Sequence, residues 1–264
     1  MRIFATSDLH TDFSANEAWL ASLSIDDYSE DALIVAGDIA HRIDRVKSTL
    51  ENLQQRFQSV FFVPGNHELW VRGEAGDSLD KFERIMVLCE RMGVLTHGQL
   101  CGEWWVAPLF SWYCARFDAD SRGDVSALRA WGDFRYCRWP QELGELDLFF
   151  AGLNKEQTPP ESARVVTFSH FVPRIELLPS QARLRFKGLP KVAGSPELEG
   201  QLRALGAEVH VFGHSHIPWD ETIDGVRYLQ QPLAYPQERH GREYAFARAR
   251  NSHEESTPTP AVER

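Results

Sequence analysis

Two histidines separated by one residue, in the sequence Gly213-His214-Ser215-His216, are the clearest candidates for chemistry in this chain. They follow a strand-like run from Glu208 to Phe212. Residues i and i+2 of a strand lie on the same face, so both imidazoles would point into one crevice just past its end. Gly213 would let the backbone turn sharply there. Neutral imidazole is the commonest side-chain metal ligand, which makes the pair a candidate metal site, with a polar loop as the alternative.

Similar polar groups follow other short apolar runs that are typical of buried strands, at residues 2–6, 32–36, 60–63 and 164–168. In order, these runs end in Asp8-Leu9-His10, Gly37-Asp38, Gly65-Asn66-His67-Glu68 and Ser169-His170. The first three alternate with helical segments, and this alternation predicts a layered α/β architecture. Because ligands bind beyond the carboxyl ends of the strands in such sheets, we expect these groups to meet.

Several further elements are predicted from local patterns. The helix at 14–24 has Ser14 as its expected N-cap and Glu17 three residues on. Amphipathic spacing predicts a helix at 44–57, and further helices are expected at 78–92, within 142–157 and at 196–205. We expect short strands at 94–96 and 104–107, a long loop at 173–196, and a hairpin around Asp224-Gly225.

Seven side chains with oxygen or nitrogen donors follow the predicted strands: Asp8, His10, Asp38, Asn66, His170, His214 and His216. Mixed oxygen and imidazole ligands suit Mn, Fe, Zn or Ni better than the all-oxygen sites of Mg and Ca. Seven ligands are too many for one ion. They suit two divalent ions that share a carboxylate.

Composition limits the classes of protein and partner. The chain has 264 residues, 43% of them hydrophobic and 25% charged, which is ordinary for a globular protein. Its net charge of −10 argues against long nucleic acids and favours a small phosphoester or a phosphoprotein as substrate. The four cysteines form no Cys-x-x-Cys pair, which argues against a zinc ribbon or a thioredoxin motif. Free thiols in a reducing compartment are the simpler expectation, with structural disulfides as the alternative. No signal-like leader and no membrane-length apolar run is present, so we expect a cytoplasmic protein without a membrane partner.

The segment 110–160 is rich in aromatic residues and arginines. It is either a structural cover, since aromatic residues dominate cores, or a specificity cap that places Arg116 or Arg138 on a phosphate and a Trp or Tyr against a ring of the substrate. We expect a single domain over residues 1–250 that contains this segment, followed by a disordered tail at 251–264. Oligomeric state is not indicated by the sequence.

Five motifs occur here in the order Asp-x-His, Gly-Asp, Gly-Asn-His-Glu, a lone His170 and Gly-His-x-His. Together they resemble the calcineurin-like metallophosphoesterase superfamily, over residues 3 to about 230. The resemblance implies a four-layer α/β/β/α sandwich of two mixed sheets. It also implies a dinuclear-metal-dependent hydrolase that attacks a phosphomonoester or phosphodiester with a metal-bound hydroxide.

The resemblance also implies roles for individual residues. Asp8, His10 and His216 would hold one metal, Asn66, His170 and His214 the other, and Asp38 would bridge them. His67 would be the acid that protonates the leaving oxygen or a clamp on the phosphoryl group. His67 and Asp38 are thus the expected catalytic residues, while Arg42, Asn66 and His67 are the expected substrate-binding residues. Two metals ~3.5–4 Å apart would clamp the attacking and leaving oxygens.

Two departures from the family pattern leave alternatives open. His41 stands where the protein serine/threonine phosphatases have an Asp that orients the histidine acid, and Glu68 is not an obvious substitute. The orienting partner of His67 is therefore not identified by the motifs. The Gly-His-Ser-His ending fits bacterial-type diesterases and small-substrate phosphatases better. A non-catalytic metal-binding scaffold of the same fold is the alternative function, against which the complete ligand set argues.

Overall fold

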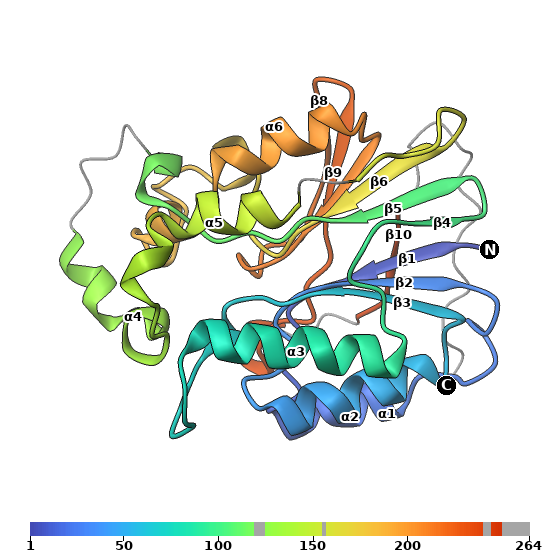
Figure 1. Ribbon diagram of the computed structural model, residues 1–264, viewed down its shortest axis with the longest axis horizontal. Helices are drawn as coiled ribbons and strands as arrows, with labels where there is room; N and C mark the ends of the chain where they lie inside the picture. Colours follow the sequence, from blue (N-terminus) through green and yellow to red (C-terminus); the bar gives the residue numbers. More distant parts are fainter. Residues whose placement is uncertain (119–124, 155–156, 240–243, 250–264) are drawn as a thin grey trace.

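Two β-sheets face each other at the centre of the molecule, and helices cover the outer face of each (Figure 1). This computed structural model describes residues 1–118, 125–154, 157–239 and 244–249. Both sheets are mixed, because each combines parallel central strands with an antiparallel edge. The expected α/β/β/α sandwich is confirmed.

The first sheet has four strands in the order β10-β1-β2-β3. Strands β1 (Ile3–Thr6), β2 (Ala32–Ala36) and β3 (Ser59–Val63) are parallel, whereas β10 (Ala247–Arg248) pairs antiparallel with β1. Since β1, β2 and β3 run in one direction, the polar residues that follow them all emerge at the same edge of the sheet.

The second sheet has six strands in the order β4-β5-β6-β7-β9-β8. Its central strands are parallel: β5 (Trp104–Pro108), β6 (Arg164–Phe168), β7 (Val209–Phe212) and β9 (Val226–Gln230). The antiparallel edge strands are β4 (Gln99–Cys101) and β8 (Trp219–Ile223). His170 follows β6 and the two motif histidines follow β7, so they reach a common edge as well.

Alternate residues of the central strands enter two different hydrophobic cores. In β2, Ile34 faces the second sheet and packs with residues such as Val166, whereas Leu33 and Val35 face the helices. Strands buried on both faces need apolar residues at every position, because successive side chains point to opposite faces. This is why the strands are recognisable as continuous apolar runs.

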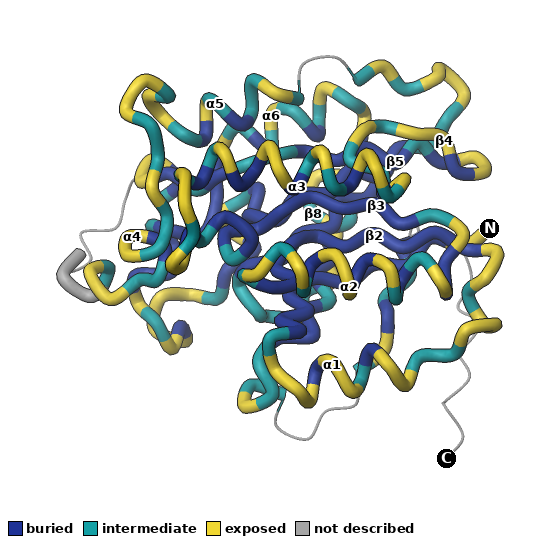
Figure 2. The backbone as a smooth tube through the Cα atoms, turned by 60° about the horizontal axis from the view of Figure 1, so that its bottom comes forward, coloured by how far each residue is buried: buried dark blue, intermediate teal, exposed yellow. Residues whose placement is uncertain are grey.

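Helices α1 (Ser14–Ala21), α2 (Ile43–Gln54) and α3 (Ser78–Met92) cover the first sheet, and α5 (Leu146–Leu153) and α6 (Pro196–Ala204) cover the second (Figure 1). The short α4 (Gly132–Tyr136) lies apart from these layers. Figure 2 shows the strands as a buried centre, and exposed residues recur along the outer sides of the helices.

Most predicted elements are confirmed within a few residues, and the ranges 32–36, 164–168 and 78–92 coincide with β2, β6 and α3. The expected N-cap was wrong: Phe13 caps α1 without a side-chain hydrogen bond, and Ser14 is already helical. The strand at 94–96 was also wrong, because Leu95 forms only an isolated bridge with Phe61. The antiparallel partner of β5 is β4, and a tight turn at Gly102 joins the two strands.

Two further regions differ in extent from their predictions. Among the described residues of 142–157, the helix is α5, and a 3-10 turn at Gln141–Leu143 precedes it. The loop at 173–196 contains 3-10 turns at Ile175–Leu177 and Leu189–Val192. Strand β10 was not predicted, since two residues carry no periodic signal. The tail at 251–264 lies outside the described residues.

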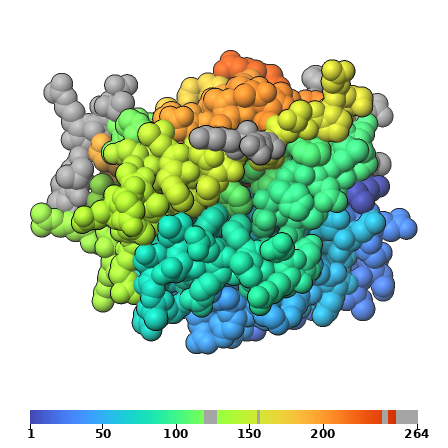
Figure 3. Space-filling view, in the orientation of Figure 1, coloured from blue at the N-terminus to red at the C-terminus, as the bar shows by residue number. Residues whose placement is uncertain are grey.

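The described part of the segment 110–160 packs onto α3, and in Figure 3 its yellow-green atoms adjoin the teal atoms of that helix. The Phe82 ring of α3 lies 5.3 Å from the Phe150 ring, and Trp112 and Phe117 are buried in the same core. None of the helices in the described part of the chain is long and apolar enough to span a bilayer. The four cysteines are free.

The buried histidine His210 makes the stability of the fold depend on pH. It is fully buried, with Nδ1 2.8 Å from the Thr167 hydroxyl and Nε2 3.1 Å from that of Ser169. Burial lowers the pKa of His210 from 6.5 to about 3. Between pH 6.5 and about pH 3 the unfolded chain binds this proton and the folded chain does not, so the free energy of unfolding should fall by about 1.4 kcal/mol per pH unit as the pH is lowered through this window.

We therefore predict that His210→Gln is less sensitive to acid than the wild type. Urea unfolding at pH 7.5 and pH 5 measures the difference. His97→Gln, at an exposed histidine, serves as control and should leave the pH dependence unchanged. Equal acid sensitivity of wild type and His210→Gln would contradict the assignment.

Candidate metal centre

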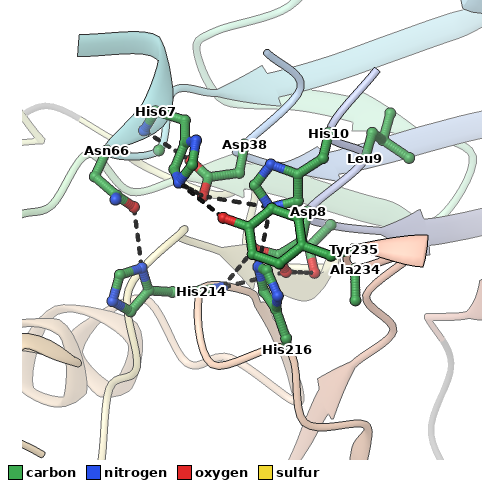
Figure 4. Close-up of polar contacts among 12 residues, drawn as sticks. Asp8, Leu9, His10, Asp38, Asn66, His67, His214, His216, Ala234 and Tyr235 are labelled. Atoms are coloured by element: carbon green, nitrogen blue, oxygen red, sulfur yellow. Dashed lines mark hydrogen bonds and ion pairs between the residues drawn. The ribbon is translucent and has the colours of Figure 1, made fainter. Parts of the chain in front are cut away.

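The polar residues that follow β1, β2, β3 and β7 converge at one end of the two sheets (Figure 4). His170, which follows β6, lies with them. Two groups of side chains there have ligand atoms that lie within 4.8 Å of one another. The first group consists of Asp8, His10, Asp38 and His216, and the second of Asp38, His170 and His214. Asp38 belongs to both groups, which is the arrangement expected of a carboxylate between two cations.

Individual distances define the first cluster. His10 Nε2 lies 2.9 Å from His216 Nε2 and 3.9 Å from Asp38 Oδ2. His216 Nε2 lies 3.4 Å from Asp8 Oδ1. Two imidazole nitrogens and two carboxylates thus face one small volume.

Asn66 completes the second cluster. Its Oδ1 lies 3.0 Å from His170 Nε2 and 3.0 Å from His214 Nδ1. His170 Nε2 is 3.5 Å from Asp38 Oδ1. All seven ligand candidates from the sequence therefore meet in one place.

The backbone is strained where these residues lie. Seven non-glycine residues in the described part of the chain have positive φ, and five of them are ligand candidates: Asp8, His10, Asp38, His214 and His216. A non-glycine residue held in this region costs of order 1–3 kcal/mol. The chain adopts an unfavourable conformation at the positions where donors must turn inward from a strand end.

Glycines allow the loops to approach closely. A Cβ on Gly65 would lie 2.2 Å from Asp38 Oδ1 and 2.7 Å from the His170 ring. Gly213 was expected to supply a sharp turn, but its φ is not in the left-handed region. Its role is instead close approach, because a Cβ there would lie 2.7 Å from the Ala36 carbonyl oxygen.

Three histidines are oriented through the ring nitrogen that faces away from the clusters. His170 Nδ1 donates to the Ala36 carbonyl at 2.9 Å, and His214 Nε2 donates to the Val192 carbonyl at 2.9 Å. His216 Nδ1 lies 2.7 Å from Glu238 Oε2. Such outer contacts fix the tautomer and leave the other nitrogen free to bind a metal.

Glu68 joins the loops after β2 and β3. Its carboxylate accepts from the backbone N–H groups of Asp38 at 2.9 Å, Ala40 at 3.0 Å and Gly65 at 2.7 Å. Burial raises the pKa of Glu68 to about 7, against the effect of these hydrogen bonds. The Glu68 carboxylate thus holds together the loops that carry Asp38 and Asn66, through backbone contacts and not through the His67 ring.

The charge states fit a pair of cations. Burial lowers the pKa values of His10, His170 and His214, so these rings are neutral, which is the form that binds metal. Burial and the nearby carboxylates of Glu68 and Asp8 raise the pKa of Asp38 well above its usual value. A cation beside Asp38 would offset the burial of its charge and the repulsion from the neighbouring carboxylates. The residues present therefore fit two divalent ions.

Asp8 and His216 behave as a charged pair. Burial alone would raise the pKa of Asp8, but His216 outweighs it and lowers that pKa to about 2. For His216, burial lowers the pKa, and Asp8 and Glu238 together raise it to about 9. A metal ion would replace the His216 proton as the positive charge beside Asp8.

His67 finds partners that its motif does not reveal. Its ring stacks on Trp70 with 3.7 Å between centroids, and its Nε2 lies 3.3 Å from the Tyr235 hydroxyl. His41, which takes the place of the family's Asp, instead pairs with Asp12 at 3.0 Å. Tyr235 and Trp70 therefore position His67.

Arg42 is the one sequence candidate that is not brought to the cluster. Its side chain is 63% exposed and pairs with Asp44 at 2.6 Å. A cavity adjoins the two clusters and is described below, and Arg42 is not among the residues that line it.

A cavity of about 650 Å³ opens beside both clusters. Asp38, Asn66, His67, His214 and His216 form part of its lining. An apolar wall adjoins them, made of Trp70, Trp131, Pro179, Leu184, Phe186, Leu189 and Ile217. Two cationic side chains, Arg183 and Arg185, also line the cavity. The donors are thus accessible to a ligand that also has an apolar part.

The segment 110–160 contributes to this cavity, but not through the arginines considered from the sequence. Arg116 pairs with Asp147 at 2.6 Å, and Arg138 donates to the carbonyls of Val71 and Glu74. Trp131 and Asp133 line the cavity instead. This favours a structural role for Arg116 and Arg138.

Four residues at the site are not indicated by the sequence motifs: Trp70, Asp133, Tyr235 and Glu238. Trp70 lies three residues after His67, so its distance from the motif was a usable signal. The other three belong to no motif and are far from their partners in sequence. Their contacts arise only from tertiary packing.

Known proteins share extended sequence similarity with this chain. The model of the calcineurin-like phosphoesterase family matches residues 1–218. The acyl-carrier-protein phosphodiesterase PptH of Mycobacterium tuberculosis is 28% identical over 273 residues, which cover 93% of this chain and 82% of PptH.

A solved structure gives the same result for the fold. The crystal structure of phosphopantetheinyl hydrolase PptH from Mycobacterium tuberculosis superimposes with a TM-score of 0.77 at 23% identity, covering 97% of this chain and 98% of that one. The family match spans all five motifs from Asp8 to His216. The chain therefore belongs to the calcineurin-like phosphoesterase family and is a phosphoester hydrolase.

Proposed function

We propose that this protein hydrolyses a phosphodiester with the help of two divalent metal ions. The observation that carries the proposal is the pair of donor clusters that share Asp38 beside the cavity. Asp8, His10 and His216 would hold one ion, and Asn66, His170 and His214 the other. The donor set suits Mn, Fe, Zn or Ni.

Two bound ions would supply Lewis acidity at the phosphoryl oxygens and an acidified water as the attacking group. The chain's own contribution is the geometry of the donors. Asn66 offers a neutral oxygen, so the centre keeps enough positive charge to attract an anionic phosphodiester. The apolar wall would exclude water from one side of the substrate and hold it in place.

His67 would bind the phosphoryl group or the leaving oxygen. Burial and the neighbouring His216 lower the pKa of His67 well below its usual value, so the ring is neutral. A neutral imidazole still donates one N–H hydrogen bond, which favours a clamp over a strong acid. The Trp70 stack and the Tyr235 hydroxyl would hold the ring toward the substrate.

A diester is favoured over a monoester for two reasons. The relative PptH is a phosphodiesterase by name, and it resembles this chain over nearly its whole length. The cavity also extends past the clusters along an apolar wall, which offers room for a second ester group. By analogy with PptH we propose the phosphodiester of a phosphopantetheinylated carrier protein as the substrate class.

We further propose that residues 1–250 act as one domain in which the segment 110–160 forms a wall of the site. One hydrophobic core includes Leu50 of α2, Phe150 of α5 and Leu202 of α6, which supports this assignment. The free thiols support a reducing, cytoplasmic compartment.

Replacing the shared carboxylate tests the two-metal proposal. Asp38→Asn should lower the metal content from two ions per chain and reduce activity more than about 100-fold, since even outer contacts of metal ligands are worth 10–100-fold. Metal analysis of the purified protein, together with initial rates, measures both effects. Asp31→Asn is the matched control, because Asp31 is also buried but pairs with Arg2 at the opposite end of β2.

In the control, metal content should remain that of the wild type. A wild type that binds no more than one ion would contradict the proposal. A wild type that is loaded with two ions, yet inactive on a broad phosphoester panel, would restore the scaffold alternative.

The choice of substrate is tested with Mn-loaded protein. We expect faster hydrolysis of bis-p-nitrophenyl phosphate than of p-nitrophenyl phosphate. We also expect release of the phosphopantetheine arm from a carrier protein, seen as a mass loss of the carrier. A clear preference for the monoester, with no release from the carrier, would contradict the diesterase assignment.

The arginines of the cavity provide a separate test. Arg183 and Arg185 are exposed and place positive charge beside the cavity of an acidic protein. Changing both to Ala should raise KM roughly tenfold with kcat unchanged and weaken the salt dependence of kcat/KM. Lys187→Ala is the matched control, because Lys187 is exposed nearby but does not line the cavity. Equal KM values for the double variant and the wild type would exclude this role.

A further inference from the structure

Asp133 is a buried carboxylate at the edge of the candidate metal centre, and none of the five motifs includes it. It lies in α4, within the segment 110–160, and is 2% exposed. Its Oδ1 accepts from Asn66 Nδ2 at 2.8 Å and from Trp70 Nε1 at 2.6 Å. Its Oδ2 accepts from Trp131 Nε1 at 2.8 Å. One carboxylate thus holds three side-chain N–H donors.

The contact with Asn66 decides which way that amide points. Both carboxylate oxygens of Asp133 act as acceptors, so they select the NH2 group of Asn66 and not its carbonyl oxygen. The amide oxygen must then face the opposite side. There it lies 3.0 Å from the nitrogens of both His170 and His214.

Through its hydrogen bonds to the two tryptophans, Asp133 also helps to fix the positions of other side chains at the site. Trp70 stacks on His67, and Trp131 lies edge-on to His214 with 5.8 Å between ring centroids. Trp131 also stacks on Phe186 in the cavity wall, with 5.3 Å between centroids. Asp133 therefore contacts one candidate ligand directly and reaches His67 and the cavity wall through single side chains.

We propose that Asp133 is a positioning residue that orients the Asn66 amide for the second metal ion and links the segment 110–160 to the metal centre. The proposal rests on the two-metal function above. It explains why the segment supplies a buried carboxylate where the apolar wall would otherwise continue. Asp133 is not itself one of the residues of either donor cluster.

The test measures metal binding directly, without reference to turnover. Metal-free full-length protein is titrated with Mn²⁺ against a fluorescent chelator, and two dissociation constants are fitted. Asp133→Ala should weaken the second ion 10–100-fold, the range found for outer contacts of metal ligands, and leave the first ion nearly unchanged. Asp133→Asn should recover most of the loss, because its amide oxygen can still accept from Asn66.

Asp147→Ala is the matched control for damage to the segment. Asp147 is buried in α5 and binds Arg116 and Ser195, away from the donor clusters. Its loss should lower the melting temperature but leave both Mn²⁺ constants as in the wild type. A second-ion constant weakened equally in Asp147→Ala and Asp133→Ala would show a general effect on the fold and overturn the proposal.

A double variant tests whether Asp133 acts through Asn66. In the Asn66→Ala background the second ion is already weakened, and Asp133→Ala should add little to that loss. Additive losses would show that Asp133 acts by another route and overturn the assignment. If the wild type itself binds one ion, the two-metal function fails; if it binds two and Asp133→Ala binds both as tightly, only the present inference fails.

Discussion

The structure depends on the burial of several polar groups whose lone pairs face one another. Asp38 is buried with the carboxylates of Asp8 and Glu68 nearby, and burial together with these neighbours raises its pKa. Uncompensated burial of such charges is expensive. Divalent cations between the carboxylates and the neutral imidazoles would remove this cost, so the donor arrangement and its electrostatics point to the same pair of ions.

The fold places these buried polar groups together at one end of the sandwich. Parallel strands in both sheets deliver their following loops to a shared edge, and positive φ values at five ligand candidates turn the side chains inward. Gly65 permits the close contact between the loop after β3 and the Asp38 and His170 side chains. The rest of the strands, buried on both faces, supply the rigid support that such strained loops require.

The segment 110–160 shows how a covering region can also act on chemistry. Its aromatic residues complete the core beside α3, and its arginines bind acids and carbonyls of the chain itself. A single buried carboxylate, Asp133, connects it to the Asn66 amide. A structural cover and a contribution to the site are therefore compatible in one segment.

The sequence alone was enough to predict the layered α/β architecture and the seven ligand candidates, because each candidate directly follows a continuous apolar strand. It did not reveal Tyr235, Glu238 or Asp133, and it offered Arg42, which pairs with Asp44 outside the cavity. Asp133 meets Asn66 across 67 residues, and Tyr235 meets His67 across 168. Contacts over such separations depend on how whole layers pack, which local periodicity and motif spacing do not encode, so only the tertiary structure decided them.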